Sequence, residues 1–319
     1  MKRFLTQITF VIALPIICIL GACEYALRMA PNDYSYKHQL VSNHLDDIRI
    51  LTFGSSHSYY GIRPEFFSKT AFNFAFVSQS IKYDKFLYEK YATRCDSLEY
   101  VILPISYFSL RSNLEESPEW WRVKGYCIYM DCDYHKTNPA YNLEITSKNK
   151  IYQLKDAVSQ TLNLITCDSL GFCLNYKKEN RMQDWKSTGE TACVRHSKGK
   201  KEDVKANVEY LEWIIQDCEK RNITVILLTT PTYYTYHSKL DSELVLEREN
   251  ICKNLETQYT NVLFLDWLKH EDFTEDDFFD ADHLNEYGAE KLSKLLNEYI
   301  LKLENELLLE SASQANTTL

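Results

Sequence analysis

Glycine is scarce in this sequence, at 8 of 319 residues, and no glycine-rich phosphate loop is present. Gly54 is the one glycine at the first predicted crossing from a strand to a helix. Loops that cradle nucleotide phosphates need several glycines at such a crossing. The sequence therefore argues against a flavodoxin-like nucleotide binder.

Basic charge is scarce as well. The 36 lysines and arginines are outnumbered by 45 aspartates and glutamates, which gives a net charge of -9. No run of basic residues alternates with aromatic residues. Because a nucleic-acid-binding surface needs positive charge to meet the phosphates, we expect no nucleic acid partner.

The sequence also lacks a CxxC pair and any cysteine and histidine spacing typical of a metal site. We therefore expect neither a metal ion nor a cofactor. Cys95, Cys218 and Cys252 fall in predicted core helices, where buried thiols are common. Five further cysteines cluster in the middle of the chain, where an exported protein can form disulfides in a pattern that the sequence does not assign: Cys127, Cys132, Cys167, Cys173 and Cys193.

The amino terminus has a positively charged start followed by an apolar segment over residues 4–22. This pattern predicts a single membrane anchor within residues 1–27. The four residues that end in Cys23 also resemble a lipobox, at which bacterial lipoproteins are cleaved and acylated on the cysteine. Both interpretations tether the protein to the cytoplasmic membrane, with its body facing the periplasm or exterior. A connector over 28–47 follows.

Short apolar segments alternate with helical patterns over residues 48–310. The predicted strands are 48–53, 71–76, 100–106, 223–231 and 262–266, and the predicted helices lie near 81–93, 204–218, 239–258 and from 286 onward. Such alternation is typical of an α/β fold in which helices wrap a mainly parallel sheet. The small, polar residues 311–319 predict a disordered tail.

The alternation stops between residues 107 and 201, which we interpret as one insertion in this domain. Aromatic residues within it, including Tyr107, Trp120 and Trp121, can provide platforms for sugar rings and are candidate substrate-binding residues. A small helical cap with its own core explains the same residues equally well.

Ser56 stands just after the first predicted strand. Gly54 permits a sharp reversal at that point, and the turn offers the serine at the carboxyl end of the strand. A serine in that place can be a nucleophile. It can also be a helix cap, because serine is favoured where a helix begins.

Asp280 and His283 lie between the last predicted strand and the closing helix. An aspartate three residues before a histidine can turn its carboxylate back toward the imidazole, which is what a nucleophilic serine needs of its base. Asp282 is a less suitable partner, because an adjacent residue in an extended loop points away. The alternative is that these are solvated residues at a helix start.

The serine turn and the aspartate-histidine segment both lie at crossings from a strand to a helix. In an open parallel sheet the carboxyl ends of the strands share one edge, where sites form. The sequence therefore predicts a catalytic triad of Ser56 as nucleophile, His283 as base and Asp280 as the partner of His283.

Residues 54–58, Gly-Ser-Ser-His-Ser, and 280–283, Asp-Ala-Asp-His, resemble the first and last blocks of the SGNH/GDSL hydrolase family. In order and spacing the resemblance spans most of the chain. It is to the membrane-attached bacterial branch, which is similar to D-alanyl transfer and alginate O-acetylation proteins. The resemblance implies a three-layer α/β/α fold with a flavodoxin-like sheet, and it implies the same three catalytic residues.

The sequence departs from the family at three places. The family often has aspartate where Ser55 stands, glycine in its second block and asparagine in its third. Here the second block, 73–80, has no glycine, so the backbone N–H groups of Ser56 and Ser78 are the candidate oxyanion donors. Loss of one oxyanion donor costs about two to three orders of magnitude in rate, which favours transfer to a specialised acceptor over fast general hydrolysis.

The resemblance implies a serine-dependent esterase or O-acyltransferase that forms an acyl-Ser56 intermediate. Its expected substrate is an acylated carbohydrate of the envelope or exterior, or another envelope ester. A transferase would work with a multi-spanning membrane partner that supplies the acyl group. The alternative is a non-catalytic envelope protein of the same fold that binds polysaccharide or organises an assembly complex, which the missing glycine and asparagine support.

Overall fold

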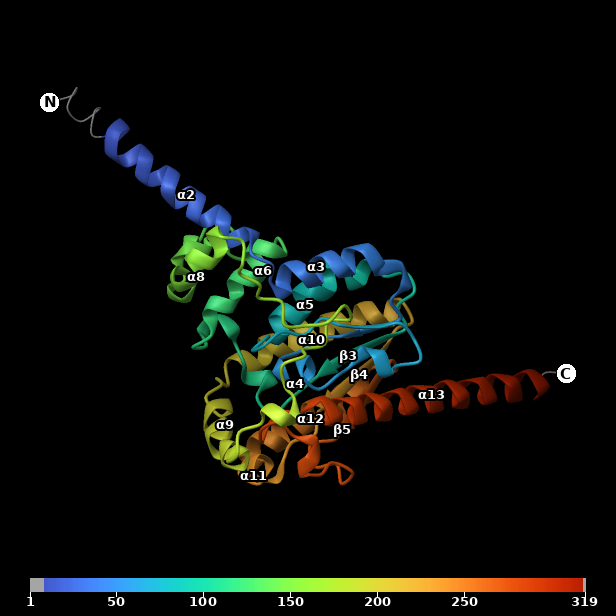
Figure 1. Cartoon of the computed structure of the whole chain (residues 1–319). Coiled ribbons are helices and arrows are strands. Elements are labelled where there is room, and N and C mark those ends of the chain that lie inside the picture. Colours follow the sequence, from blue (N-terminus) through green and yellow to red (C-terminus); the bar gives the residue numbers. More distant parts are fainter. Residues whose placement is uncertain (1–8, 318–319) are drawn as a thin grey trace. The chain divides into compact units, whose positions relative to one another are not determined.

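The computed structural model describes residues 9–317 of the chain (Figure 1). It divides into two compact units, which are described separately below. Unit 1 contains the chain up to Leu40 and Leu114–Thr166, and unit 2 contains Val41–Asn113 and the chain from Cys167 onward. The limits of these units are not the domain limits that we expect from the sequence. The expected domain limits stay predictions.

Unit 2 contains a five-stranded sheet whose neighbouring strands are all parallel. The strands are β1 (Ile50–Thr52), β2 (Ala71–Asn73), β3 (Tyr100–Pro104), β4 (Thr224–Thr229) and β5 (Val262–Asp266). Their order in space is β2-β1-β3-β4-β5, which is the flavodoxin-like order. In that order the direction of winding reverses beside β1, so the carboxyl end of β1 is where such sheets form sites.

The helices of unit 2 follow the strands in alternation. The longer ones are α5 (Ile81–Lys90), α9 (Thr188–His196), α10 (Asp203–Lys220), α12 (Ser242–Gln258) and α13 (Glu286–Thr317), and the single-turn helices are α4 (Ser56–Tyr59) and α11 (Tyr234–His237). Short 3₁₀ turns also occur at Leu45–Asp47, Pro64–Phe66, Ala92–Arg94, Ser109–Arg111, Lys178–Asn180, Trp185–Ser187 and Glu275–Asp277. Helix α3 (Asp33–His44) leads into the unit from unit 1.

Helices cover both faces of the sheet, with α5 and α10 on one side and α13 on the other (Figure 1). On the α13 side, Ile50 and Ile226 of the strands share a buried core with Leu292 and Leu296. On the other side, Tyr88 of α5 donates a hydrogen bond to Asp217 of α10 at 2.8 Å. The predicted three-layer α/β/α architecture with a parallel sheet is therefore confirmed.

Helix α13 begins where the sequence predicts it. Asn285 caps the helix, because its Oδ1 accepts hydrogen bonds from the backbone N–H groups of Tyr287 at 2.9 Å and Gly288 at 3.0 Å. The helix then continues to Thr317, whereas the sequence predicts no regular structure from residue 311. Each added residue costs little once a long helix has formed, which explains how these polar residues can extend it.

Unit 1 is made of helices. They are a π-helical turn, Thr9–Ala13, then α2 (Leu14–Met29), the start of α3, α6 (Val123–Tyr129), α7 (Pro139–Asn142) and α8 (Lys148–Val158), with 3₁₀ turns at Leu114–Glu116, Trp120–Arg122 and Glu144–Thr146. The end of α2 is tied to this unit, since Glu24 accepts hydrogen bonds from the backbone N–H groups of Glu144 at 3.0 Å and Ile145 at 2.9 Å.

One helical segment in the described residues is long and apolar enough to cross a membrane. It runs from Phe10 to Met29 with a hydropathy of 2.2, and 6% of the tested part is buried. The predicted apolar segment near the amino terminus is thus present as a helix. The positively charged start expected to orient it lies within residues 1–8, outside the described residues.

Candidate active site

A tight turn joins β1 to α4 and presents Ser56. Gly54 has a φ of 106°, a conformation that side chains disfavour. A Cβ atom there would lie 2.7 Å from Ser58 Oγ and 3.2 Å from Pro104 Cδ, so glycine is also required for space. Every residue from Leu51 to Ile62 is buried except Ser56, which is half-buried. The turn therefore offers one side chain to the surface.

A buried carboxyl group is hydrogen-bonded to the backbone of this turn. Asp84 Oδ1 accepts a hydrogen bond from the backbone N–H of Gly54 at 2.8 Å and another from Gln79 Nε2 at 2.6 Å. Burial raises the pKa of Asp84 to about 7, although both hydrogen bonds favour the ionised form. The side chain thereby connects α5 to the turn that carries the serine.

The second half of the site is the loop before α13. Phe278 and Leu284 form an antiparallel bridge that closes this loop. Inside it, Asp280 Oδ1 accepts hydrogen bonds from the backbone N–H groups of Asp282 at 3.1 Å and His283 at 2.8 Å. These bonds turn the carboxylate back over the loop, as the spacing of three residues predicts.

The structure brings Ser56, His283 and Asp280 together in one hydrogen-bonded chain. His283 Nε2 lies 2.8 Å from Ser56 Oγ. His283 Nδ1 lies 3.0 Å from Asp280 Oδ1 and 3.1 Å from Oδ2. The imidazole is therefore held between a hydroxyl and a carboxylate, which is the order that a serine nucleophile, its base and an orienting acid require.

Two carboxylates act on the His283 ring. Burial alone lowers the pKa of His283, but the charges of Asp280 and Asp282 outweigh burial and raise that pKa to about 9. Burial opposes ionisation of Asp282, yet the neighbouring imidazoles, His283 first among them, hold the pKa of Asp282 far below its usual range. The site thus favours a protonated His283 beside an ionised Asp282 at neutral pH.

His57 belongs to a second network beside the triad. Its Nδ1 lies 2.8 Å from Ser106 Oγ and 3.4 Å from Thr230 Oγ1, and its Nε2 lies 3.7 Å from Asp282 Oδ2. That last distance is too long for a hydrogen bond. Burial lowers the pKa of His57. Its ring nitrogens face these groups and not Ser56, so His283 is the base that the geometry provides.

His196 and Arg195, at the end of α9, complete this network. Arg195 Nη2 donates a hydrogen bond to Asp282 Oδ2 at 3.0 Å, and His196 Nε2 lies 3.8 Å from the same oxygen. His196 Nδ1 lies 2.7 Å from the Tyr236 hydroxyl. Burial lowers the pKa of His196 well below its usual range. Asp282 is therefore a buried anion surrounded by an arginine and three histidines.

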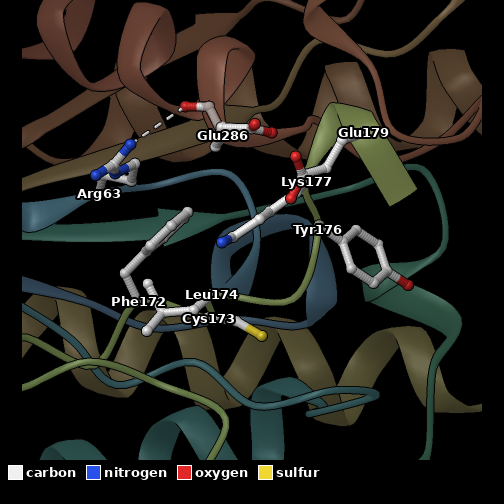
Figure 2. A pocket seen from close by; sticks show the side chains of 8 residues that line it. All are labelled: Arg63, Phe172, Cys173, Leu174, Tyr176, Lys177, Glu179 and Glu286. Atoms are coloured by element: carbon white, nitrogen blue, oxygen red, sulfur yellow. Dashed lines mark hydrogen bonds between the residues drawn. The ribbon is translucent and has the colours of Figure 1, made fainter. Parts of the chain in front are cut away.

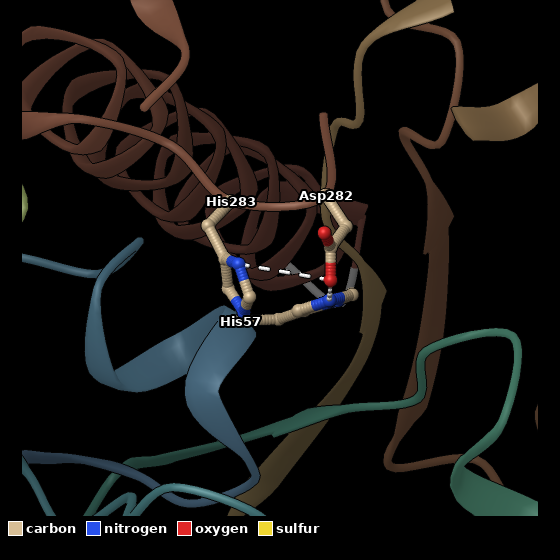
Figure 3. A group of neighbouring side chains, drawn as sticks. All are labelled: His57, Asp282 and His283. Carbon is tan, nitrogen blue, oxygen red and sulfur yellow. Dashed lines mark ion pairs between the residues drawn. The ribbon is translucent and has the colours of Figure 1, made fainter. Parts of the chain in front are cut away.

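His57, Asp282 and His283 have side-chain types that bind metal ions, and one ligand atom of each lies within 4.8 Å of the others (Figure 3). In the present arrangement Asp282 already accepts a hydrogen bond from Arg195, and His283 Nδ1 is paired with Asp280. An ion at this place would have to displace both contacts. As arranged, the cluster is a hydrogen-bonded and charge-paired network.

An aromatic stack stands beside His283, and one of its rings belongs to a residue that also lines a cavity. The Tyr176 ring stacks on Tyr60 at 3.5 Å and on Phe279 at 4.1 Å between ring centroids, and it stands edge-on to His283 at 5.4 Å. Tyr176 also lines a cavity of about 310 Å³. The other residues that line it are Arg63, Phe172, Cys173, Leu174, Lys177, Glu179 and Glu286 (Figure 2). Tyr176 thus connects the triad to a cavity with charged residues in its lining.

The sequence also predicts an oxyanion donor and three substrate-binding residues, which do not contact the triad in any hydrogen bond described above. Ser78 has a φ of 60°, a left-handed conformation that glycine normally supplies, so the backbone here takes the shape that the missing glycine would have favoured. Tyr107 is 5% exposed, and its hydroxyl accepts a long hydrogen bond from the Asp241 N–H. Trp120 and Trp121 are 40% and 39% exposed but belong to unit 1. Their roles stay predictions.

A scan against models of known protein families finds no match, and neither does a search of curated proteins. Solved structures do match. One is a candidate platelet activating factor from Streptococcus pneumonia, with 14% identity and a TM-score of 0.41 over 91% of this chain and 98% of that chain.

Two further matches come from Bacteroides. A candidate acylhydrolase from Bacteroides fragilis has 10% identity and a TM-score of 0.39 over 80% of this chain and 87% of its own. A GDSL-like lipase from Bacteroides thetaiotaomicron has 8% identity and a TM-score of 0.41 over 84% and 99%. Likenesses this low do not assign an activity, so the function is inferred from the side chains of the site.

Proposed function

We propose that the protein is a serine esterase or O-acyltransferase of the SGNH type. The observation that carries this proposal is the chain of contacts from Ser56 Oγ to His283 Nε2 at 2.8 Å and from His283 Nδ1 to Asp280 at 3.0 Å. All three side chains come from crossings at the same edge of a parallel sheet, where such sheets form their sites.

In the first half of the proposed reaction, neutral His283 accepts the hydroxyl proton of Ser56 as Oγ attacks the carbonyl carbon of an acyl ester. Asp280 accepts the hydrogen bond of Nδ1–H and stabilises the imidazolium that forms. The tetrahedral intermediate then collapses, the ester C–O bond breaks, and His283 Nε2 gives its proton to the departing alcohol. Ser56 is left acylated.

In the second half, water or a sugar hydroxyl attacks the acyl group. His283 takes the proton of the attacking group and returns a proton to Ser56 Oγ as the acyl bond breaks. With water the products are a carboxylic acid and free enzyme, and with a sugar the product is a new ester. The same residues therefore support hydrolysis and transfer.

The oxyanion of each tetrahedral intermediate needs backbone donors, for which we propose the N–H groups of Ser56 and Ser78. The left-handed φ of 60° at Ser78 supports this role, because it gives the loop the conformation that a glycine would otherwise provide. The hydroxyl of Ser106, after β3, bonds to His57 at 2.8 Å and so does not replace the missing asparagine.

We propose an acylated polysaccharide of the envelope or exterior as the substrate. The stacked rings beside His283 and the charged lining of the adjoining cavity suit a polar ring better than a lipid chain. The apolar segment Phe10–Met29 is consistent with a single anchor in the cytoplasmic membrane. In the transferase version, a multi-spanning membrane partner supplies the acyl group.

The test is hydrolysis of a chromogenic acetyl ester and of an acetylated polysaccharide by the detergent-solubilised full chain. Replacing Ser56 or His283 with alanine is expected to reduce both activities to the uncatalysed background, because triad members act as a unit. Ser55→Ala is the matched control, since Ser55 caps α4 without a side-chain hydrogen bond and its variant is expected to retain activity. Unchanged activity in Ser56→Ala would contradict the proposal.

A non-catalytic polysaccharide-binding protein of the same fold is the second candidate function. It is favoured by the use of the Ser106 hydroxyl in a contact with His57, which leaves the third block without a side-chain oxyanion donor. In that case Ser56→Ala and His283→Ala would both keep full biological activity. The enzyme hypothesis predicts that both variants lose biological activity.

A further inference from the structure

Four of the ten cysteines form two close pairs that the proposed chemistry does not use. One pair, Cys127 and Cys132, lies wholly in unit 1, and the other, Cys167 and Cys173, lies wholly in unit 2. All four side chains are buried, with exposed fractions between 2% and 8%. The structure records all ten cysteines as thiols.

Cys167 and Cys173 face each other across an antiparallel bridge. The backbone N–H of Asp168 donates to the Phe172 carbonyl at 2.9 Å, one residue inside the pair, so the cysteines occupy a non-hydrogen-bonded position. Cα atoms in that position are about 4.5 Å apart and their side chains point to the same side. This spacing lies inside the range of about 4.4–6.8 Å that a disulfide requires.

Cys127 and Cys132 are brought together by a reversal of the chain after α6. The backbone N–H groups of Met130 and Cys132 both donate to the Tyr126 carbonyl, at 3.1 Å and 3.0 Å, so the chain folds back at once. The left-handed φ of 49° at Asp131 completes the reversal. The neighbouring Cys132 side chain and burial raise the pKa of the Cys127 thiol, as expected if the reversal of the chain brings the two side chains close together.

Other cysteines have partners of a different kind. Cys95 Sγ contacts the Tyr91 carbonyl at 3.5 Å, and Cys218 Sγ contacts the Tyr88 hydroxyl at 3.2 Å. Cys95 directly follows a 3₁₀ turn and Cys218 lies within α10, and the neighbour of each sulfur is an oxygen. These cysteines serve as internal controls, because the same oxidising conditions act on them.

We propose that Cys127–Cys132 and Cys167–Cys173 are the two disulfide bonds of this protein in an oxidising compartment. The oxidant is a disulfide-bearing compound, either a small molecule or a protein. One cysteine thiolate attacks the oxidant and releases one of its sulfurs as a thiol. The second cysteine thiolate then displaces the other sulfur, so two electrons and two protons leave the pair and the oxidant becomes a dithiol or two thiols.

The second bond would fix a segment beside the triad. The backbone N–H of Asn73 donates to the Leu170 carbonyl at 2.9 Å, and that of Cys173 donates to the Tyr59 carbonyl at 3.1 Å. These contacts place the loop against β2 and the serine turn, three residues before Tyr176. Closing the loop with a disulfide restricts the segment that presents Tyr176 to His283.

The test uses the full chain, unfolded with reductant and refolded in detergent with a buffer of oxidised and reduced glutathione. The protein is then denatured, alkylated without further reduction, digested and mapped by mass spectrometry. We expect two disulfide-bonded products, one for each pair, and each is lighter by two hydrogen atoms than its thiol form. The four paired cysteines should show almost no alkylation. Cys95, Cys218 and Cys252 are expected to be alkylated.

Two variants check the pairing. Cys173→Ser is expected to free Cys167 for alkylation and to leave the Cys127–Cys132 bond intact, and Cys218→Ser is expected to leave both bonds unchanged. The map of the unaltered chain decides the proposal even where a variant fails to fold. Alkylation of all ten cysteines, or bonds between other cysteines, would overturn the proposal. If only one pair forms a disulfide, the proposal is wrong for the other pair.

Discussion

At the scale of single residues, His283 decides what this site can do, because it contacts the serine and both acids. Asp280 holds Nδ1 with two oxygens at 3.0 and 3.1 Å, whereas Asp282 Oδ2 lies 3.6 Å away and is paired with Arg195. The first carboxylate therefore orients the ring. The second acts mainly through its charge.

The two acids are expected to respond differently to replacement. Asp280→Asn should lower kcat by about 10⁴-fold, because an amide in that place favours the wrong tautomer of the ring. Asp282→Asn should lower kcat much less but move the pH profile to lower pH, since it removes one of the charges that raise the pKa of His283. Kinetics of both variants from pH 5 to 10 check this. Equal losses would contradict the assigned roles.

The pH dependence of the proposed activity follows from the raised pKa of His283, about 9. Below that pH the imidazole already carries a proton and cannot accept the one from Ser56. We therefore expect kcat/KM to rise about tenfold per pH unit and to level off above pH 9. A stable acetyl ester with correction for background hydrolysis is the suitable substrate. A plateau that begins near pH 6 would show that the carboxylates do not raise the pKa.

The sequence predicted that Ser56, Asp280 and His283 meet, and their contacts agree with this, whereas it did not predict the network around Asp282. Ser56, Asp280 and His283 stand at the ends of strands with clear turn signals. Arg195 and His196 lie in a stretch without strand or helix periodicity, so nothing in the sequence relates them to residues 57 and 282. Their contribution depends on tertiary packing, which a local pattern does not encode.

At the scale of elements, the turn between β1 and α4 positions Ser56, the proposed nucleophile. Its geometry depends on Gly54, whose positive φ and lack of a side chain leave room for Ser58 and Pro104. The carboxyl group of Asp84 then fixes the Gly54 N–H at 2.8 Å. The orientation of the Ser56 side chain is therefore set by β1, Gly54 and Asp84 together.

Gly54→Ala is expected to destabilise the protein by about 1–3 kcal/mol and to reduce activity, because the strained backbone and the close atoms must both shift. Gly21→Ala is the matched control, as a Cβ atom there meets nothing within 4 Å. Denaturant unfolding in detergent measures the difference. A Gly54 variant as stable as the Gly21 variant would mean that the turn is not constrained in this way.

Most strands and helices of unit 2 were predictable because each has a simple period and a clear end. The strand 262–266 has the same limits in the sequence and the structure, and α13 begins at the predicted residue because Asn285 caps it. Between residues 107 and 201, apart from α8 and α9, the helices and 3₁₀ turns span three to seven residues, which is too brief to establish a period. Their arrangement depends on contacts that are distant in sequence.

At the scale of the whole molecule, the segment Phe10–Met29 predicts where the protein resides. Its apolar side chains are largely exposed, including Ile16 at 50% and Ile19 at 62%. In water such a surface is unfavourable, and in a bilayer it is not. A membrane environment is therefore the simplest way to cover it.

Replacing Ile16 and Ile19 together with aspartate is expected to move the protein from the membrane fraction to the soluble fraction. Each aspartate near the centre of a spanning helix costs about 2.5–3.5 kcal/mol. Tyr152→Asp, an 86% exposed position outside the segment, should leave the protein in the membrane. Retention of the double variant in salt- and carbonate-washed membranes would contradict the anchor.

The central claim is that Ser56, activated by His283, is the nucleophile. The most direct measurement is the reaction of the full chain with a serine-directed phosphonate, followed by peptide mapping. We predict one adduct on Ser56, no adduct at that position in Ser56→Ala, and much slower formation in His283→Ala. An adduct on another residue, or undiminished labelling of Ser56→Ala, would contradict the account.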